Sequence, residues 1–273
     1  MSGPMSGIIA GAQPPKPISI FICAFGYGGI QSETLTSLLE ETLVLNKCKV
    51  TWELNPVHGD ALISRSRSKA LSKFLATSHD VCFMVDHDLQ WTPGALMMIA
   101  QKAAERQAMV GGLYPCRGIG RGLSSRMKNN TVTFKAGDDL LLDAVYLATG
   151  FIAIPRVVAE EVLKHGQDAF NEFHRDESSD VTMHAMLSEC IYGDGTSFHD
   201  FFRPICVQRT VAVVRDAKNE AVAPYEYLSE DWAFSWRARF ANPNRPIYAW
   251  TAPWLIHHGG YGYTLFDAYR AKP

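Results

Sequence analysis

Val81-Cys82-Phe83-Met84-Val85-Asp86-His87-Asp88 decides the fold, because five apolar residues run directly into two carboxylates one residue apart. An unbroken apolar run is typical of a strand that is buried on both faces of a sheet. A strand that ends in Asp-x-Asp carries both carboxylates at its carboxyl edge, where open α/β sheets bind ligands and where divalent cations can meet phosphates. The stretch indicates a nucleotide-using enzyme. The alternative is a strand before a polar turn, because Asp is common in turns and Pro93 lies just beyond.

Strand and helix patterns alternate on either side of this stretch. Apolar runs predict strands at 18–25, 49–54, 81–85 and 109–113, and amphipathic stretches predict helices around 35–43 and over 61–76. Thr92 and Pro93 predict another helix start, with Thr92 as N-cap and Pro93 at the first helical position. This alternation predicts an α/β fold with a Rossmann-like, mostly parallel, doubly wound sheet that is flanked by helices and joined by right-handed crossovers.

The pattern becomes less regular beyond Pro115. We predict a mobile loop at 117–122, a strand at 145–154 interrupted by Gly150, helices at 155–165 and 229–240, a strand at 246–250 and a loop at 257–263. A chain of 273 residues with 47% hydrophobic content can bury one large core. We therefore expect a flexible leader at 1–17 and a single domain at 18–273.

Composition excludes several classes of partner. The 26 basic and 28 acidic residues give a net charge of −2, so no global field attracts nucleic acid or an anionic membrane. No stretch approaches the roughly 20 apolar residues that a membrane span requires. The six cysteines are widely spaced and form no C-x-x-C pair, which favours reduced thiols and a cytoplasmic location.

The loop Gly26-Tyr27-Gly28-Gly29 follows the first expected strand. A dinucleotide-binding fingerprint would need a third glycine where Gln31 stands, so an NAD site is disfavoured. Glycine here still allows the backbone to approach a base or ribose, and Tyr27 could stack on a base. A tight turn between strand and helix explains the same residues.

Arg65 and Arg67 lie early in the helix expected at 61–76. Arginine near a helix N-terminus is unfavourable for the helix dipole unless an anion is close. One of the two is expected to face a diphosphate or the Asp86 carboxylate, and solvated surface arginines are the alternative.

Two later segments carry further candidates. Ser229-Glu230-Asp231-Trp232 is ordinary helix-start chemistry, but a carboxylate there could also act as a general base on a hydroxyl, beside an apolar platform for a sugar ring at Trp232. His257 and His258 could supply one imidazole to a metal held by Asp88, and a surface or core role is the alternative.

Taken in order, these motifs resemble the GT-A glycosyltransferases over most of the chain, from Ile18 to Tyr263. The matching set is the glycine loop, the arginine-bearing helix, Asp86-His87-Asp88 as the D-x-D motif, Gly112-Leu113-Tyr114-Pro115, Ala148-Thr149-Gly150-Phe151, Ser229-Glu230-Asp231-Trp232 and His257-His258-Gly259. His87 and Ser68 depart from the residues common in related sequences, a small residue and Asn respectively.

The resemblance implies a metal-dependent transferase that moves a sugar from a nucleoside-diphosphate sugar, with UDP favoured, to a saccharide or other hydroxyl acceptor. It implies that 18–115 is the half that binds the nucleotide sugar, that 116–273 is the acceptor and catalytic half, and that the fold has a smaller acceptor-side subregion. The implied residues are Asp86, Asp88 and His257 for Mn²⁺ or Mg²⁺; Phe25, Tyr27, Arg65, Arg67, Asp86, His87 and Asp88 for the donor; Gly150 and Trp232 for the acceptor; and Asp231, with Glu230 as the alternative, for catalysis.

Two rival readings remain open. Haloacid-dehalogenase phosphatases also carry Asp-x-Asp after an apolar strand, but on their first strand and normally with Thr or Val where Gln90 stands. A non-catalytic GT-A-like module would bind a nucleotide sugar or glycan without turnover, and it would need neither metal nor base. The joint presence of Asp86, Asp88, Asp231 and His257 argues against that module.

Overall fold

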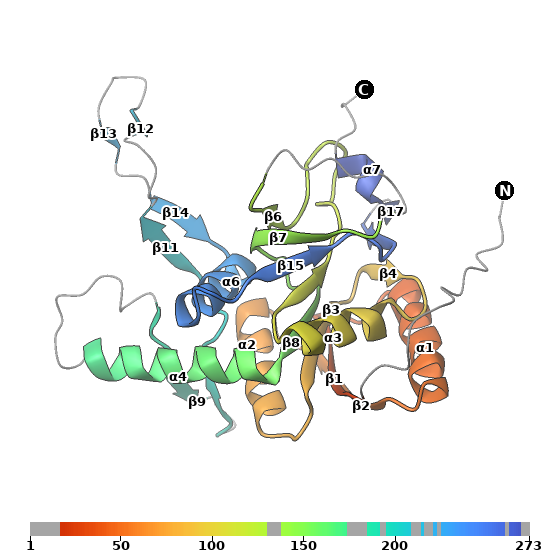
Figure 1. Cartoon of the computed structure of the whole chain (residues 1–273), viewed down its shortest axis with the longest axis horizontal. Helices are drawn as coiled ribbons and strands as arrows, with labels where there is room; N and C mark the ends of the chain where they lie inside the picture. Colours follow the sequence, from red (N-terminus) through yellow and green to blue (C-terminus); the bar gives the residue numbers. More distant parts are fainter. Residues whose placement is uncertain are drawn as a thin grey trace.

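The protein folds as an α/β sandwich with a large central sheet between two layers of helices (Figure 1). The computed structural model describes residues 17–129, 138–173, 185–191, 195–208, 214–215, 221–222, 225–259 and 262–268. The expected leader lies outside the described residues except for Pro17.

The central sheet has the strand order β2-β1-β3-β8-β5-β15-β7-β6. Its strands are β1 (Ser19–Gly26), β2 (Thr51–His58), β3 (Val81–Asp86), β5 (Val110–Gly112), β6 (Arg126–Met127), β7 (Leu141–Tyr146), β8 (Phe151–Pro155) and β15 (Ile247–Trp250). The strands β8 and β7 run against the other six, so most of the sheet points one way.

Helices cover both faces of the sheet. They are α1 (Ser32–Lys47), α2 (Ile63–Leu75), α3 (Ala95–Arg106), α4 (Arg156–Phe173) and α6 (Glu230–Ala241), with the short α7 (Leu265–Ala268) near the end. Small sheets are formed by β4 (Leu89–Trp91), β16 (Leu255–His258) and β17 (Gly262–Tyr263), by β9 (Glu189–Ile191) and β10 (Ser197–His199), by β11 (Ile205–Gln208) and β14 (Tyr225–Leu228), and by β12 (Val214–Arg215) and β13 (Ala221–Val222).

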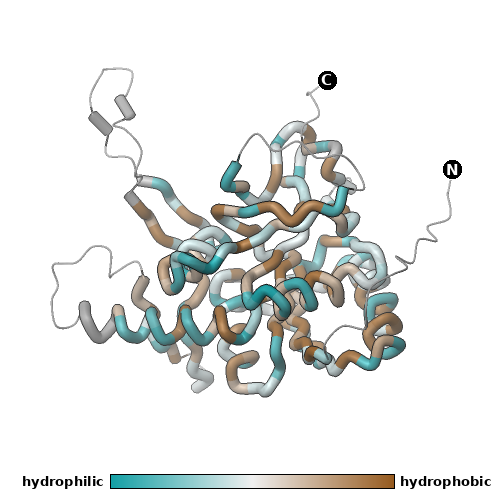
Figure 2. The backbone as a smooth tube through the Cα atoms, in the orientation of Figure 1, coloured by the Kyte–Doolittle hydropathy of each residue, from teal (hydrophilic) through white to brown (hydrophobic). Residues whose placement is uncertain are grey.

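Neighbouring residues of the central strands point to opposite faces of the sheet, so a separate core lies on each face. In β1, Phe21 and Cys23 face the core shared with α2, α4 and α6, whereas Ile20 and Ile22 face the core shared with α1 and α3. Because both faces are covered there, β1, β3 and β8 are buried along almost their whole length, as their apolar sequences predicted. Figure 2 shows the hydrophobic residues concentrated along the strands.

The α/β class, the mostly parallel sheet and the flanking helices are confirmed, but two details differ from the prediction. The run expected as one strand at 145–154 is two strands, β7 and β8, separated by a turn at Gly150. Within this mostly parallel sheet, β8 lies antiparallel between β3 and β5. The expected loop at 257–263 contains β16 and β17, since β16 pairs with β4.

The start of α3 corrects another expectation. Thr92 is not its N-cap: the helix begins at Ala95 after Gly94, whose φ of 90° lies in the left-handed region that glycine tolerates. Glu41 of α1 supplies the cap instead, since its carboxylate accepts hydrogen bonds from the Gly94 and Met97 amides at 2.9 and 3.0 Å. A cap contributed by another helix leaves no local sequence signal.

Replacing Glu41 with Ala is expected to lower the free energy of unfolding by about 2–3 kcal/mol, because the helix loses its cap and the buried Trp91 indole loses its acceptor. Burial outweighs the hydrogen bonds and raises the pKa of Glu41, so the charge itself is unfavourable in the fold. Glu41→Gln keeps one acceptor oxygen and should cost about half as much. Urea unfolding measures both, and equal losses for the two variants would contradict the capping role.

Candidate functional site

Arg67 lies at the centre of the candidate site and is 2% exposed. Its Nη2 donates to both carboxylate oxygens of Asp86, at 2.8 and 3.0 Å, and its Nη1 donates to Glu230 at 3.0 Å and to Asp231 at 2.6 Å. Burial alone would lower the pKa of Arg67, but the three carboxylates outweigh it and hold the pKa above its usual range. The guanidinium is therefore a fixed cation shared by three acids.

Three distant parts of the chain meet here because of the fold. Arg67 projects from α2, Asp86 ends β3, and Glu230 and Asp231 occupy the first turn of α6. The expectation that one of the two arginines faces Asp86 is confirmed for Arg67. Arg65 instead pairs with Asp60 at 2.6 Å.

Asp231 is held by two donors. The Thr149 hydroxyl and the Arg67 guanidinium both donate to Oδ1 of its carboxylate, whose side chain is 22% exposed. Burial raises the pKa of Asp231, and the charges of Glu230 and Asp86 add to the effect, which Arg67 and Thr149 only partly oppose. A partly buried carboxylate with a raised pKa is suited to accepting a proton.

Asp88 and His257 form a second pair. The Asp88 side chain is 3% exposed, and its Oδ2 lies 3.6 Å from His257 Nε2 and 3.1 Å from a guanidinium nitrogen of Arg117. Burial opposes the charge of Asp88, but the hydrogen bond and charge of His257, together with Arg117 and His87, outweigh it and lower the pKa of Asp88. Asp88 is thus an ionised carboxylate in a nearly closed position.

The pairing of two short strands brings these residues together. β4 follows Asp88 and pairs with β16, so that Leu89 lies opposite His257. Neighbouring residues of a strand point to opposite faces, which separates the two histidines. His257 faces Asp88, and His258 is hydrogen-bonded to Gln90 at 2.9 Å.

Gly150 and Tyr114 lie between the Arg67 cluster and the Asp88–His257 pair. The Gly150 amide donates to the Tyr114 hydroxyl at 3.1 Å, and its carbonyl accepts from the Asp86 amide at 2.8 Å. The Tyr114 ring meets His257 edge-on, with centroids 5.3 Å apart. A Cβ at Gly150 would lie 2.4 Å from the Tyr114 hydroxyl oxygen and 2.8 Å from Asp86 Oδ2.

Gly150→Ala should therefore destabilise the protein by about 1–3 kcal/mol, the usual cost of overpacking. Removing the hydroxyl that the new methyl group meets, in the double variant Gly150→Ala with Tyr114→Phe, should recover part of the loss. Thermal unfolding of the two single variants and the double variant measures this coupling. Strictly additive losses would contradict the steric explanation.

The remaining predicted residues surround this centre. Tyr27 is 68% exposed, His87 is half-buried, and Phe25 is buried with its ring centroid 5.9 Å from the Arg67 guanidinium carbon. Trp232 stacks on Tyr146 with centroids 5.0 Å apart, and its indole nitrogen donates to a carbonyl. Phe25 thus supports Arg67, whereas Tyr27 is free to meet a ligand.

Sequence reasoning gave no individual role to Tyr114, Thr149 or Arg117. Tyr114 and Thr149 stood inside motifs quoted for the resemblance, but nothing in the sequence showed their partners. The one signal shared by Tyr114 and Thr149 is their place in the chain. Tyr114 follows β5 and Thr149 precedes β8, and these two strands are adjacent in the sheet. Segment 117–122 has no helix or strand, as predicted, but its Gly120 and Gly122 amides donate to carbonyls of α7 at 2.7 and 2.9 Å.

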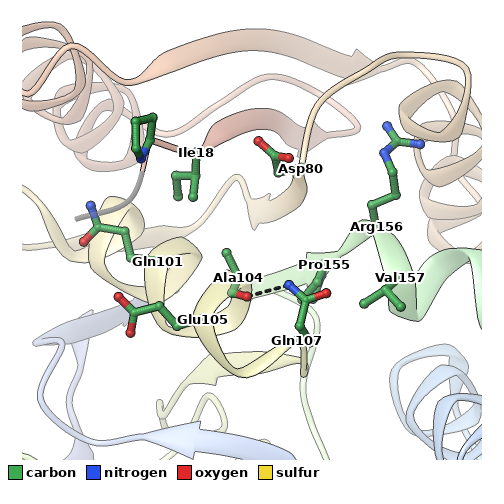
Figure 3. Close-up of a pocket in the computed structure, with 10 residues that line it drawn as sticks. Ile18, Asp80, Gln101, Ala104, Glu105, Gln107, Pro155, Arg156 and Val157 are labelled. Atoms are coloured by element: carbon green, nitrogen blue, oxygen red, sulfur yellow. Dashed lines mark hydrogen bonds between the residues drawn. The ribbon is translucent and has the colours of Figure 1, made fainter.

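A pocket of about 550 Å³ lies at the opposite, amino-terminal edge of the sheet (Figure 3). Its Arg156 donates to carbonyls at and beyond the end of α2, including that of Thr77 at 2.8 Å. Its Asp80 accepts from the amide and hydroxyl of Ser19. Since both groups are engaged by the chain itself, we place the candidate site at the carboxyl edge.

Within the described ranges, no group of three or more His, Cys, Asp or Glu side chains is arranged to hold a metal ion. Asp88 and His257 offer two ligand atoms, while both Asp86 oxygens are bonded to Arg67.

No helix in the described part of the chain is long and apolar enough to cross a membrane.

The fold and the site define an α/β protein with an arginine-centred acid cluster at the carboxyl edge of its sheet. No family model and no curated protein matches the sequence. Among solved structures, A197 from STIV is similar at 15% identity and a TM-score of 0.48, over 92% of this chain and 91% of that one.

Two further structures are similar over less than half of their own length. S. aureus TarS 1–349 in complex with UDP-GlcNAc has 10% identity and a TM-score of 0.33, over 53% of this chain and 47% of that one. GalNAc-T7 with UDP, GalNAc and Mn²⁺ has 9% identity and a TM-score of 0.43, over 92% of this chain and 45% of that one. At these scores the likeness carries no weight for function, which depends on the side chains of the site.

Proposed function

We propose that the protein is a GT-A-type glycosyltransferase that moves a sugar from a nucleoside-diphosphate sugar, with UDP favoured, to a hydroxyl of a saccharide or similar acceptor. The observation that carries the proposal is the buried Arg67, which links Asp86 of the D-x-D motif to Glu230 and Asp231 of a distant helix. Such a network joins a donor-side acid to a candidate base across a single cation.

The donor diphosphate is proposed to lie against Asp88 and His257, with a divalent cation between them. Their ligand atoms are 3.6 Å apart, a separation that lets a carboxylate oxygen and an imidazole nitrogen share one ion. Two protein ligands suffice where phosphate oxygens and water complete the coordination, the usual arrangement at nucleotide sites. A cation held there would neutralise charge on the departing diphosphate.

His257 is pre-oriented for this role. Its Nδ1 lies 2.9 Å from the Pro115 carbonyl oxygen. A carbonyl only accepts hydrogen bonds, so Nδ1 carries a proton and Nε2 is the ring atom that would meet a cation. Of the two histidines considered from the sequence, His257 is therefore the proposed ligand, and Asp86 is proposed to contact the donor rather than the ion.

Asp231 is proposed to remove the proton from the acceptor hydroxyl, with Glu230 as the alternative. Its raised pKa and the bond from Thr149 support this role, because a base needs both proton affinity and a fixed direction. Trp232 is proposed to present an apolar ring face to the acceptor sugar beside Gly150, and Tyr27 and His87 to contact the donor. The Arg117 end of loop 117–122 is proposed to close over the bound donor, while Gly120 and Gly122 stay bonded to α7.

Thermal unfolding with UDP-, GDP- and dTDP-sugars, each with and without Mn²⁺, tests the proposal. A ligand that binds only the native state raises the melting temperature, so one nucleotide class should shift it and Mn²⁺ should enlarge the shift. No shift with any nucleotide would contradict the proposal. A shift without sugar transfer or donor hydrolysis would favour the second candidate, a GT-A-like binding module.

A further inference from the structure

We infer that Arg117 is a tethered counter-ion that competes with a divalent cation for Asp88 and moves to the donor diphosphate when the cation binds. The inference rests on the proposed function, because it assigns a cation site to Asp88 and His257. It starts from one atom: Asp88 Oδ2 is the partner of both Arg117, at 3.1 Å, and His257, at 3.6 Å.

The Asp88 carboxylate needs a positive partner. Its side chain is 3% exposed, and a buried carboxylate without a cation is strongly unfavourable. The Arg117 guanidinium supplies that charge, since its Nη2 lies 3.1 Å from Oδ2. Arg117 and His257 thus approach the same carboxylate oxygen.

A divalent cation between Asp88 and His257 would use that oxygen as a ligand. The guanidinium hydrogen bond and the metal bond then compete for Oδ2, and two cations a few ångströms apart repel one another. Binding of the ion therefore requires Arg117 to leave. Arg117 therefore weakens the affinity for the free ion and balances the Asp88 charge when no cation is bound.

The structure gives Arg117 the freedom to leave. Its side chain is 57% exposed, whereas the loop behind it is fixed at Gly120 and Gly122 by the amide bonds to α7. The aliphatic part of Arg117 passes close to Gly259, where an added Cβ would lie 3.2 Å from the arginine Cδ. The guanidinium can therefore swing from Asp88 to a phosphate without displacing the anchored loop, and arginine suits phosphate as well as carboxylate.

Titration of wild type, Arg117→Gln and Arg121→Gln with Mn²⁺ alone, followed by calorimetry or by electron paramagnetic resonance of the free ion, tests the competition. Arg117→Gln should bind Mn²⁺ roughly three- to tenfold more tightly than wild type. Arg121→Gln removes a charge of the same loop, whereas the ion pairs of Asp88 are with Arg117 and His257, so this variant should bind Mn²⁺ like wild type. Circular dichroism confirms that each variant is folded.

Equal or weaker Mn²⁺ binding by Arg117→Gln, with binding retained by wild type, would overturn the inference and leave the proposed function intact. Absence of Mn²⁺ binding in all three proteins would instead overturn the metal assignment and the inference together. In a second titration at saturating Mn²⁺, UDP should bind Arg117→Gln several-fold more weakly than wild type. Unchanged UDP affinity would overturn the transfer of Arg117 to the diphosphate.

Discussion

Arg67→Met is expected to lower the free energy of unfolding by about 3–5 kcal/mol, because it leaves Asp86, Glu230 and Asp231 without their shared cation. The methionine replaces much of the buried volume, so the loss reports charge rather than a cavity. Chemical unfolding at neutral pH measures the effect. The same variant should lose donor-dependent activity, since the acids at the site are no longer held in place.

Arg65→Met is the matched control. It removes an arginine two residues earlier in the same helix, but that side chain is 30% exposed and pairs with Asp60. A pair of this kind contributes about 0–1 kcal/mol. The deficit of Arg67→Met should also shrink as the pH falls, because protonation of the three carboxylates relieves their repulsion. Equal deficits in both variants, or a pH-independent one for Arg67→Met, would contradict the central role of Arg67.

Asp231→Asn is expected to reduce the rate of sugar transfer by about 10²–10⁴-fold and to leave nucleotide binding within a fewfold of wild type. The amide keeps an oxygen that can accept from Thr149 and Arg67, but it cannot take a proton from the acceptor. Steady-state transfer assays and UDP titrations on the same preparation separate the two effects. Glu230→Gln is the matched comparison, and a larger loss there would move the base to Glu230.

The pH profile of transfer follows from the same carboxylate. A base acts only when it is deprotonated, so activity should fall as the pH drops through the pKa of Asp231. Because burial raises that pKa, the acidic limb should lie above the range of an ordinary aspartate. An acidic limb at the usual aspartate range would assign the proton transfer to another group.

Much of the fold could be predicted from local pattern. The strands β1 and β3 are buried on both faces, and their unbroken apolar runs predicted them as buried strands. The direction of β8 and the cap of α3 could not be predicted, because both depend on tertiary partners. β8 is as apolar as a parallel strand, and Glu41 reaches α3 from 53 residues away in sequence.

The residues of the candidate site could be named from the sequence, but their contacts with one another could not. The ordered motifs named Arg67, Asp86, Asp88, Asp231 and His257, all of which line two adjoining clusters in the structure. The sequence did not show that Arg67 occupies both oxygens of Asp86, or that Arg117 reaches Asp88. Such contacts depend on side-chain directions that no spacing rule fixes.

The central claim is that Asp88 makes nucleotide binding depend on a divalent cation. Calorimetric titration of UDP into wild type and Asp88→Asn, each with and without Mn²⁺, tests it most directly, since Asn keeps the shape of the side chain and removes its charge. We predict that Mn²⁺ strengthens UDP binding to wild type by about tenfold or more and has no such effect on Asp88→Asn. The same UDP affinity in both proteins, with and without Mn²⁺, would contradict the account.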